Sequence, residues 1–270
     1  MKTILLPIND DDGAEARLQA SLDIARAFGG HVDALQVTPL NAFVSLDSFG
    51  GVYVMTDVME KVRATEARLR SETEARLARE GVSWAYEHCD GEPAATIVDR
   101  SRLADVVVLS PAVKEPRPGE PLPLAGDVAV HGRTPVLAVP AGMRGFAVAG
   151  TVLVAWNGSD EGAQALKAAL PLLKLAGKVV VATVAEPDPD RFPATDACTW
   201  LSRHGIASEL VEVPAGPGGV TEALLDAREQ AGADYVVMGA YGHSRLREAV
   251  LGGVTRGMLR HCPVPLFLAH

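Results

Sequence analysis

The sequence has little cysteine and no long apolar run, and both shortages narrow the classes of protein it can belong to. Three of its 270 residues are cysteines, and Cys89, Cys198 and Cys262 lack the paired spacings of a disulfide framework or a structural zinc site. No stretch reaches the roughly 18 consecutive apolar residues of a membrane-spanning helix. The sequence therefore predicts a soluble chain that does not enter a membrane and holds no metal.

Basic residues are also too few for a nucleic-acid binder. The 25 lysines and arginines are outnumbered by 34 aspartates and glutamates, which gives a formal net charge of -9. Non-specific nucleic-acid binding depends on neutralising phosphates with Lys and Arg, so an acidic chain disfavours it. The opening residues, MKTILLPINDDDG, contain only a short apolar run without the core of a signal peptide. A cytoplasmic location is expected.

Recognisable catalytic patterns are missing too. The chain shows no Ser-His-Asp order, no H-E-x-x-H, no paired carboxylates at helical spacing and no P-loop lysine. His261 and Cys262 close a predicted helix, where a histidine beside carbonyl groups and a small core cysteine are a better reading than a metal site. We therefore predict no catalytic residue, and an enzyme is the less favoured class.

What is present is an alternation of apolar strands and helices. An irregular loop is expected over Pro39 to Tyr53, and a long charged helix over about Asp57 to Glu80, with Val58 and Leu77 among its inward residues. Asp10 to Asp12 offer N-caps to the first helix, which ends at Gly29. The strands expected in the first half are Thr3 to Asn9, His31 to Val37, Val82 to His88, Asp105 to Ser110 and Pro135 to Pro140.

The second half repeats this order at a period of about 148 residues. Asn157 falls where Asn9 stood and Val184 where Val37 stood. The repeat predicts two tandem domains, residues 1–140 and residues 150–270. Strands that alternate with helices predict an α/β fold with a doubly wound, parallel five-stranded sheet in each domain. Ligands of such sheets bind at the carboxyl ends of the strands.

One stretch of the second domain, Ala233 to Ala269, points to a ligand. It contains a buried strand, Tyr235 to Met238, then a loop with two glycines, and a helix that opens near the pair Gly252 and Gly253. Glycines at a strand exit and at a helix start bring bare backbone amides against an anion. A nucleotide or phosphate site is the first hypothesis.

Gly239, Gly242 and Gly252 form the pattern G-x2-G-x9-G, and with this motif and its whole-chain repeat the sequence resembles the universal stress protein (UspA-like) family in its tandem two-domain form. The resemblance implies an adenine nucleotide alpha hydrolase-like fold and a non-catalytic stress-response module that binds ATP or another adenine nucleotide. The residues that match the family's binding positions are Asn157, Val184, Met238, Gly239, Gly242, Gly252, Gly253 and Val254.

Two of these residues depart from the family's pattern. Asn157 stands where the ATP binders tend to carry Asp, and Gly253 where they carry Ser or Thr. Losing one hydroxyl hydrogen bond changes binding by about 1 kcal/mol, roughly fivefold, so weakened or altered nucleotide binding is expected. In the first half Ser110 and Pro111 replace the glycine entry and the motif is lost, which confines the expected site to the second half.

Structural explanations stay open for the same residues. The three motif glycines could serve only turns and helix packing, and Gly253 and Gly257 could let the last helix pack closely on the sheet. Asn157 could form a turn before an N-cap at Ser159 or Asp160. Val184 and Met238 would be apolar in any buried sheet. His243, Arg245 and Arg247 could approach phosphates or form a solvated loop.

Two rival functions remain. One is a scaffold that binds other proteins, so far unknown, through the charged helix and the loop from Pro39 to Tyr53. The other is a weak hydrolase that acts on a nucleotide or an ester with help from His243 or a bound metal. The resemblance also implies that Pro135 to Pro140 and Pro263 to Ala269 pair across a pseudo-twofold axis, as an intramolecular pseudo-dimer that could dimerise further. Such pairing would bury two apolar sheet edges.

Overall fold

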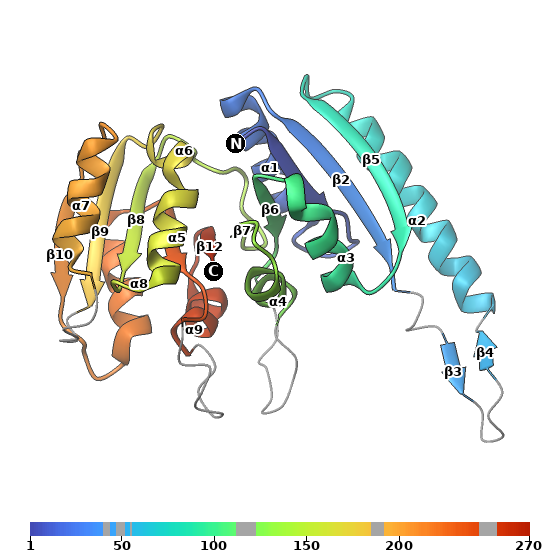
Figure 1. The fold of residues 1–270 in the computed structure, drawn as a ribbon. Helices are drawn as coiled ribbons and strands as arrows, with labels where there is room; N and C mark the ends of the chain where they lie inside the picture. Colours follow the sequence, from blue (N-terminus) through green and yellow to red (C-terminus); the bar gives the residue numbers. More distant parts are fainter. Residues whose placement is uncertain (40–43, 47–51, 55, 112–122, 185–191, 243–252) are drawn as a thin grey trace.

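Ten strands form one continuous sheet through the whole molecule (Figure 1). The computed structural model describes residues 1–39, 44–46, 52–54, 56–111, 123–184, 192–242 and 253–270. The strands of the first half are β1 (Thr3–Pro7), β2 (His31–Thr38), β5 (Ser83–Asp90), β6 (Val106–Leu109) and β7 (Val136–Ala138). Those of the second half are β8 (Thr151–Trp156), β9 (Lys178–Val184), β10 (Glu209–Val213), β11 (Tyr235–Gly239) and β12 (Leu266–Ala269).

Each half is a parallel sheet with the same internal order, and the two sheets meet edge to edge. The full order is β10-β9-β8-β11-β12-β7-β6-β1-β2-β5, so the first strand of each half is central and the chain winds outward on both sides of it. Only the junction is antiparallel: Phe267 of β12 lies opposite Leu137 of β7. The predicted α/β class with a doubly wound sheet in each half is confirmed, and so is the predicted pairing of the two last strands.

Helices cover both faces of the sheet and divide the core into two layers. One layer lies under α1 (Ala14–Phe28), α2 (Thr56–Leu77), α5 (Asp160–Ala168), α6 (Leu170–Leu173) and α7 (Ala194–Arg203). The opposite layer lies under α3 (Pro93–Arg100), which continues as a 3-10 turn at Ser101–Leu103, and under α4 (Leu124–His131), α8 (Gly219–Ala231) and α9 (Gly253–His261). Because both faces are covered, the central strands are apolar along their whole length, and all four residues of β6 are buried.

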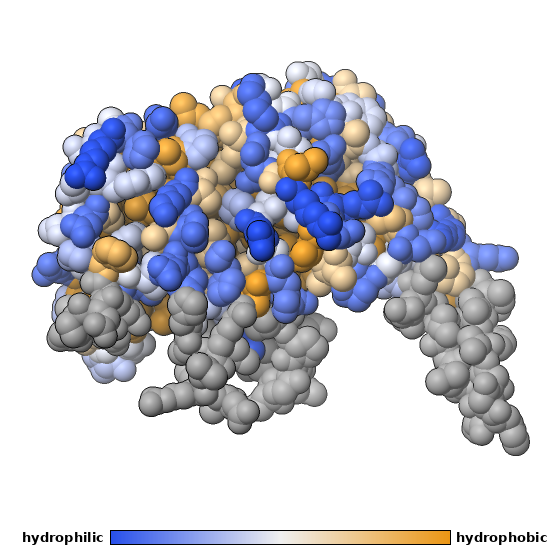
Figure 2. Space-filling view, viewed as in Figure 1, coloured by the Kyte–Doolittle hydropathy of each residue, from blue (hydrophilic) through white to orange (hydrophobic). Residues whose placement is uncertain are grey.

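The surface seen in Figure 2 is mostly hydrophilic, with apolar residues in scattered areas between the charged side chains. Long side chains of α2 contribute ion pairs to it: Arg68 contacts both Asp10 and Glu72, and Arg70 contacts Glu74. Within the described residues, no helix has the length and apolar character needed to cross a membrane.

Several local predictions are wrong. The first helix is not capped by an aspartate: its N-cap is Gly13, and Asp11 instead accepts hydrogen bonds from the Gly13 backbone N–H and from Arg17. Its end at Gly29, in the left-handed conformation, is as predicted. In the stretch expected as an irregular loop, two short strands, β3 (Val44–Leu46) and β4 (Val52–Val54), pair in antiparallel fashion, consistent with their β-branched residues.

Helices account for two further differences. The helix α4 was not expected, because the Pro- and Gly-containing stretch before Thr134 reads as a loop in sequence. On α2, Leu77 is buried as predicted, but the side chain of Val58 is 39% exposed.

The connection between the halves is fixed to both of them. The backbone N–H of Phe146 donates to Asp23 Oδ2 of α1 at 2.8 Å, and the Phe146 ring packs on Tyr235 of β11 with 5.0 Å between ring centroids. Earlier in the connection, the Val139 N–H donates to the Leu109 carbonyl at 2.7 Å. The connecting segment therefore packs against both halves as part of the core and is not a flexible linker.

Tyr235 gives a first testable prediction. Its side chain is fully buried, and its hydroxyl has no hydrogen-bond partner among the described residues. Burial, together with the nearby charge of Asp234, raises the pKa of this hydroxyl, so it stays neutral. A buried donor without a partner costs about 1–3 kcal/mol. Tyr235→Phe is therefore expected to raise the free energy of unfolding by about 1 kcal/mol, measured by urea denaturation.

Tyr86 is the matched control. Its hydroxyl donates to Gln36 Oε1 at 2.8 Å, so Tyr86→Phe removes a formed hydrogen bond and is expected to lower the free energy of unfolding by about 1 kcal/mol. Equal losses of stability in the two variants would contradict the assignment of Tyr235 as an unsatisfied buried donor.

Candidate functional site

The carboxyl ends of β9, β8 and β11 form the floor of the candidate site. These strands are neighbours in the sheet, with Trp156 of β8 opposite Thr183 of β9, and Ala155 opposite Met238 of β11. Their ends therefore bring Val184, Asn157 and Gly239 to one edge, although the three lie far apart in sequence. Met238 is buried and Val184 half-buried, both against the layer under α8 and α9, while Asn157 is exposed.

Gly239 is required by packing alone. A Cβ atom added here would lie 2.6 Å from the backbone nitrogen of Gly162 and 2.7 Å from the carbonyl carbon of Glu161. Both atoms belong to the backbone of α5, which cannot move aside as a flexible side chain can. The end of β11 thus approaches the first turn of α5 more closely than any side chain would allow.

Tyr241, between Gly239 and Gly242, connects this loop to α9 and to the first half. The backbone N–H of Tyr241 donates to Thr255 Oγ1, in the first turn of α9, at 3.2 Å. Tyr241 itself has a φ of 54°, unusual for a residue with a side chain. Its buried ring reaches α4, where a Cβ added at Gly126 would lie 2.4 Å from the Tyr241 hydroxyl. Burial raises the pKa of this hydroxyl.

The start of α9 is the next part of the candidate site, after the strand ends and the glycine loop. Gly253 is exposed, and a Cβ added to it would meet no atom of the described residues within 4 Å, so none of them requires a glycine here for packing. Val254 is half-buried. Gly257 does have a packing role, but against α8 instead of the sheet: its Cβ would lie 2.7 Å from Thr221 Oγ1. Gly252, His243, Arg245 and Arg247 lie outside the described residues.

Asn157 takes part in the turn that starts α5. Its Oδ1 accepts hydrogen bonds from the Ser159 backbone N–H at 3.2 Å and from Ser159 Oγ at 2.9 Å. Ser159 in turn caps α5, since its Oγ accepts a bond from the Gly162 N–H at 3.1 Å. The structure therefore shows the turn-forming role of Asn157.

Glu161 is a residue of this site that sequence reasoning missed. It lies in the first turn of α5, where an acidic side chain is favoured by the helix dipole, and it is buried. A Cβ added at Gly242 would lie 3.3 Å from Glu161 Oε2. A carboxylate therefore sits beside the glycine loop. Its role was hard to predict from sequence, because a glutamate that follows Ser-Asp is typical of any helix N-terminus.

Among the described histidines, His270 reaches the glycine loop: its Nδ1 lies 2.7 Å from the Ala240 carbonyl oxygen. Burial raises the pKa of the Cys262 thiol, which packs in the apolar layer under α8 and α9. Within the described ranges, no group of three or more His, Cys, Asp or Glu side chains is placed to hold a metal ion.

In the first half the corresponding edge is built differently. Ser110 follows β6 at the place that Gly239 takes on β11, and its hydroxyl accepts a hydrogen bond from Arg17 Nη1 at 2.5 Å. A Cβ added at Gly13 would lie 2.2 Å from this hydroxyl. At this edge the first half therefore carries a hydrogen-bonded serine side chain where the second half carries a glycine.

The chain is similar to known proteins of one family. Residues 201–270 match the model of the universal stress protein family. A universal stress protein of Synechocystis sp. is 24% identical over 289 residues, which cover 98% of this chain and 99% of the relative.

Solved structures show the same fold over the whole chain. A universal stress protein from Archaeoglobus fulgidus DSM 4304 superposes with a TM-score of 0.77 at 19% identity, covering 99% of this chain and 97% of that one. A structure from Pseudomonas aeruginosa UCBPP-PA14 gives a TM-score of 0.61 at 17% identity, covering 100% and 93% of the two chains. The last part of the chain thus matches the universal stress protein family model, and the whole chain shares its two-part fold with a solved universal stress protein.

Proposed function

We propose that this chain is a stress-response module whose second half binds an adenine nucleotide without turning it over. The observation that carries the proposal is the hydrogen bond from the Tyr241 N–H to Thr255 Oγ1, which holds the turn from Gly239 to Gly242 against the start of α9. A strand-end turn and a helix N-terminus that lie side by side present backbone N–H groups and a positive dipole end to an anion.

Each part of the nucleotide has a place in this arrangement. The phosphates would accept bonds from the N–H groups of the first turn of α9, where no described residue lies within 4 Å of a Cβ added at Gly253. The adenine would lie against Val184 and Met238, at the ends of β9 and β11. The ribose would lie near the exposed Asn157, whose Oδ1 already accepts two bonds from Ser159. A hydroxyl of the ribose therefore competes for an occupied acceptor, which weakens binding.

Charge favours a nucleotide with few phosphates. Glu161 is buried beside Gly242, so each added phosphate charge meets a nearby carboxylate. Two like charges about 6 Å apart at an effective dielectric constant of about 20 repel by about 3 kcal/mol, and salt lowers this figure. AMP is therefore expected to bind more tightly than ATP.

Calorimetry on the full chain tests this. AMP is expected to bind about tenfold more tightly than ATP, and Glu161→Gln to raise the affinity for ATP about tenfold while changing that for AMP less. Phosphate release from ATP, measured in the same samples, is expected to stay at the background rate.

Glu229→Gln is the control, because Glu229 is an exposed residue of α8 and its replacement changes the net charge equally. An equal gain in ATP affinity from this variant would assign the effect to net charge and not to the site. If AMP, ADP and ATP all fail to bind up to about 1 mM, the proposal of a nucleotide site fails.

A further inference from the structure

Three polar side chains of the first half meet on one face of the sheet, across the neighbouring strands β2 and β5. His31 lies opposite Ser83 in the register of the two strands, and Asp33 lies two residues further along β2. Side chains alternate between the faces of a strand, so all three point to the same face. In sequence His31 and Ser83 are 52 residues apart, and only the pairing of β2 with β5 brings them together.

The three side chains form a continuous series of contacts. His31 Nδ1 lies 2.7 Å from Ser83 Oγ, and His31 Nε2 lies 3.2 Å from Asp33 Oδ1. A carboxylate can only accept hydrogen bonds, so Nε2 carries the proton, and in the neutral ring Nδ1 is then an acceptor. The Ser83 hydroxyl therefore donates to Nδ1. These are the contacts that join a nucleophile, its general base and the group that orients the base.

Solvent reaches all three groups. Ser83 is exposed, and the side chains of His31 and Asp33 are 36% and 40% exposed. The helix α3 packs on this face further along β2, where Leu35 is buried. Ala85, which lies opposite Asp33 and is also exposed, adds only a methyl group beside Ser83. A small molecule can therefore approach Ser83 Oγ directly from solvent.

We propose that Ser83, His31 and Asp33 form a second functional site, which hydrolyses small carboxylic esters. Ser83 Oγ bonds to the carbonyl carbon of the ester while His31 Nδ1 takes the hydroxyl proton. The bond from this carbon to the alcohol oxygen then breaks, and His31 gives the proton to the leaving oxygen. Water attacks the acyl group on Ser83 in the same way, which releases the carboxylic acid and restores the serine. This site does not depend on the proposed nucleotide site.

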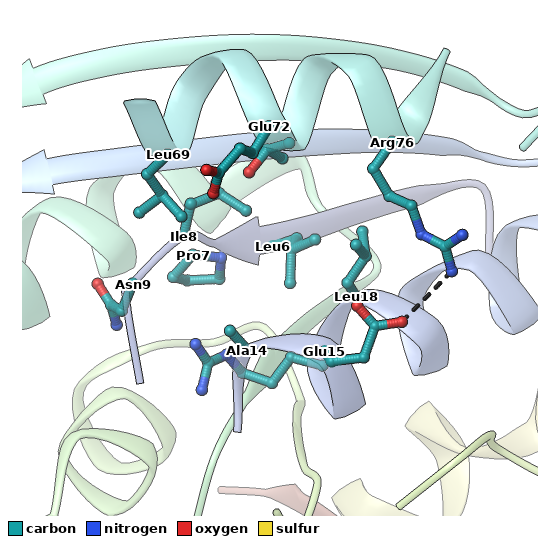
Figure 3. Close-up of a pocket in the computed structure, with 12 residues that line it drawn as sticks. Leu6, Pro7, Ile8, Asn9, Ala14, Glu15, Leu18, Leu69, Glu72 and Arg76 are labelled. Atoms are coloured by element: carbon teal, nitrogen blue, oxygen red, sulfur yellow. Dashed lines mark hydrogen bonds and ion pairs between the residues drawn. The ribbon is translucent and has the colours of Figure 1, made fainter. Parts of the chain in front are cut away.

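The cavity of the first half does not serve this site. Its volume is about 250 Å³, and it is bounded by the end of β1, by α1 and by α2. Figure 3 shows Leu6 of β1 and Leu18 of α1 facing Leu69 of α2 across this space. These residues belong to the layer under α1 and α2, on the face of the sheet opposite to Ser83. An ester at Ser83 therefore rests on the exposed part of the sheet, which favours a short acyl chain such as acetyl.

Hydrolysis of p-nitrophenyl acetate by the full-length protein tests the proposal. Release of p-nitrophenol is expected to exceed the rate in buffer and to pass through an acetyl group carried by Ser83. Protein quenched with acid during turnover is digested, and peptide mass spectrometry locates the acetyl group. Acetylation of lysines alone, with Ser83 unmodified, overturns the proposal.

Variants of the two reacting groups locate the activity. Ser83→Ala and His31→Gln are each expected to lower the rate above background about 100-fold, the low end of what a positioned general base contributes. His131→Gln is the control, because His131 is an exposed histidine of α4 that pairs with Asp127 at 2.8 Å. It is expected to leave the rate unchanged. Equal losses in the two histidine variants, or an unchanged rate in Ser83→Ala, contradict the assignment.

Asp33 is a positioning residue, since it contacts His31 and not the ester. In Asp33→Asn the new amide can donate to Nε2, which favours the wrong tautomer of the ring. This variant is expected to lower kcat about tenfold and to leave the KM for the ester unchanged. Glu87→Gln, which removes an exposed carboxylate from the same face of β5, is expected to change neither constant. Equal kcat values in Asp33→Asn and Glu87→Gln would contradict the role of Asp33.

Discussion

Replacing Gly239 with alanine is expected to lower the free energy of unfolding by about 3 kcal/mol, a large share of the stability of a domain. The new methyl group would lie 2.6 Å from the Gly162 nitrogen and 2.7 Å from the Glu161 carbonyl carbon. Neither atom can yield without moving the first turn of α5 away from β11. Because Asn157 and Ser159 organise that same turn, the strain would spread into the candidate site. Urea denaturation of the full chain measures the loss.

Two other glycines of the motif region are the controls. Gly253→Ala places its methyl group more than 4 Å from every described residue and is expected to change stability by less than about 0.5 kcal/mol. Gly242→Ala meets the end of the Glu161 side chain at 3.3 Å, a group that can shift, so its cost should fall between the two. If Gly239→Ala proves as stable as Gly253→Ala, the close approach of β11 to α5 is not essential to the fold.

Truncating Phe267 to alanine is expected to cost about 3–5 kcal/mol, the range for a large aromatic side chain removed from a core. Phe267 is fully buried in β12 and lies opposite Leu137 of β7, at the junction of the two halves. The cavity would open in the apolar layer under α1 and α5, where neighbours from both halves pack. The halves are then expected to unfold in separate steps, which calorimetry would show as two transitions.

Phe192→Ala is the matched control, since the Phe192 side chain is 62% exposed. The bond from Trp156 Nε1 to Phe192 uses the backbone carbonyl and survives the substitution. A change below about 0.5 kcal/mol is expected. A cost for Phe267→Ala as small as this would mean that the junction between β7 and β12 contributes little to stability.

The sheet was predictable from sequence because each central strand is buried on both faces and so reads as an uninterrupted apolar run. The repeat then aligned the two halves, and the partners of the last strands followed from the family resemblance. Helices on the periphery were harder to place. The helix α4 lies in a stretch where prolines and glycines dominate the local signal, and Val58 is exposed because α2 extends beyond the sheet it covers.

The position of the candidate site was also predictable, since strand ends and glycine spacing are local features. The roles of its side chains were not. Glu161 and Tyr241 derive their importance from burial by parts of the chain far away in sequence, and nothing in their neighbours indicates it. Arg17 is a similar case. From sequence, an arginine on the first helix is expected to be exposed, whereas in the structure distant parts of the chain bury it.

The junction between the two sheets has a consequence for synthesis of the protein. Leu137 of β7 pairs with Phe267 of β12, which the ribosome adds about 130 residues later. At typical translation rates of about 5–20 residues per second, the β7 edge stays unpaired for roughly 7–26 s while the second half emerges from the ribosome. During that interval its Val136, Leu137 and Ala138 offer an apolar strand edge to any neighbouring nascent chain. Chaperone protection of the growing polypeptide is therefore most needed after the first half has folded and before the last strand is made.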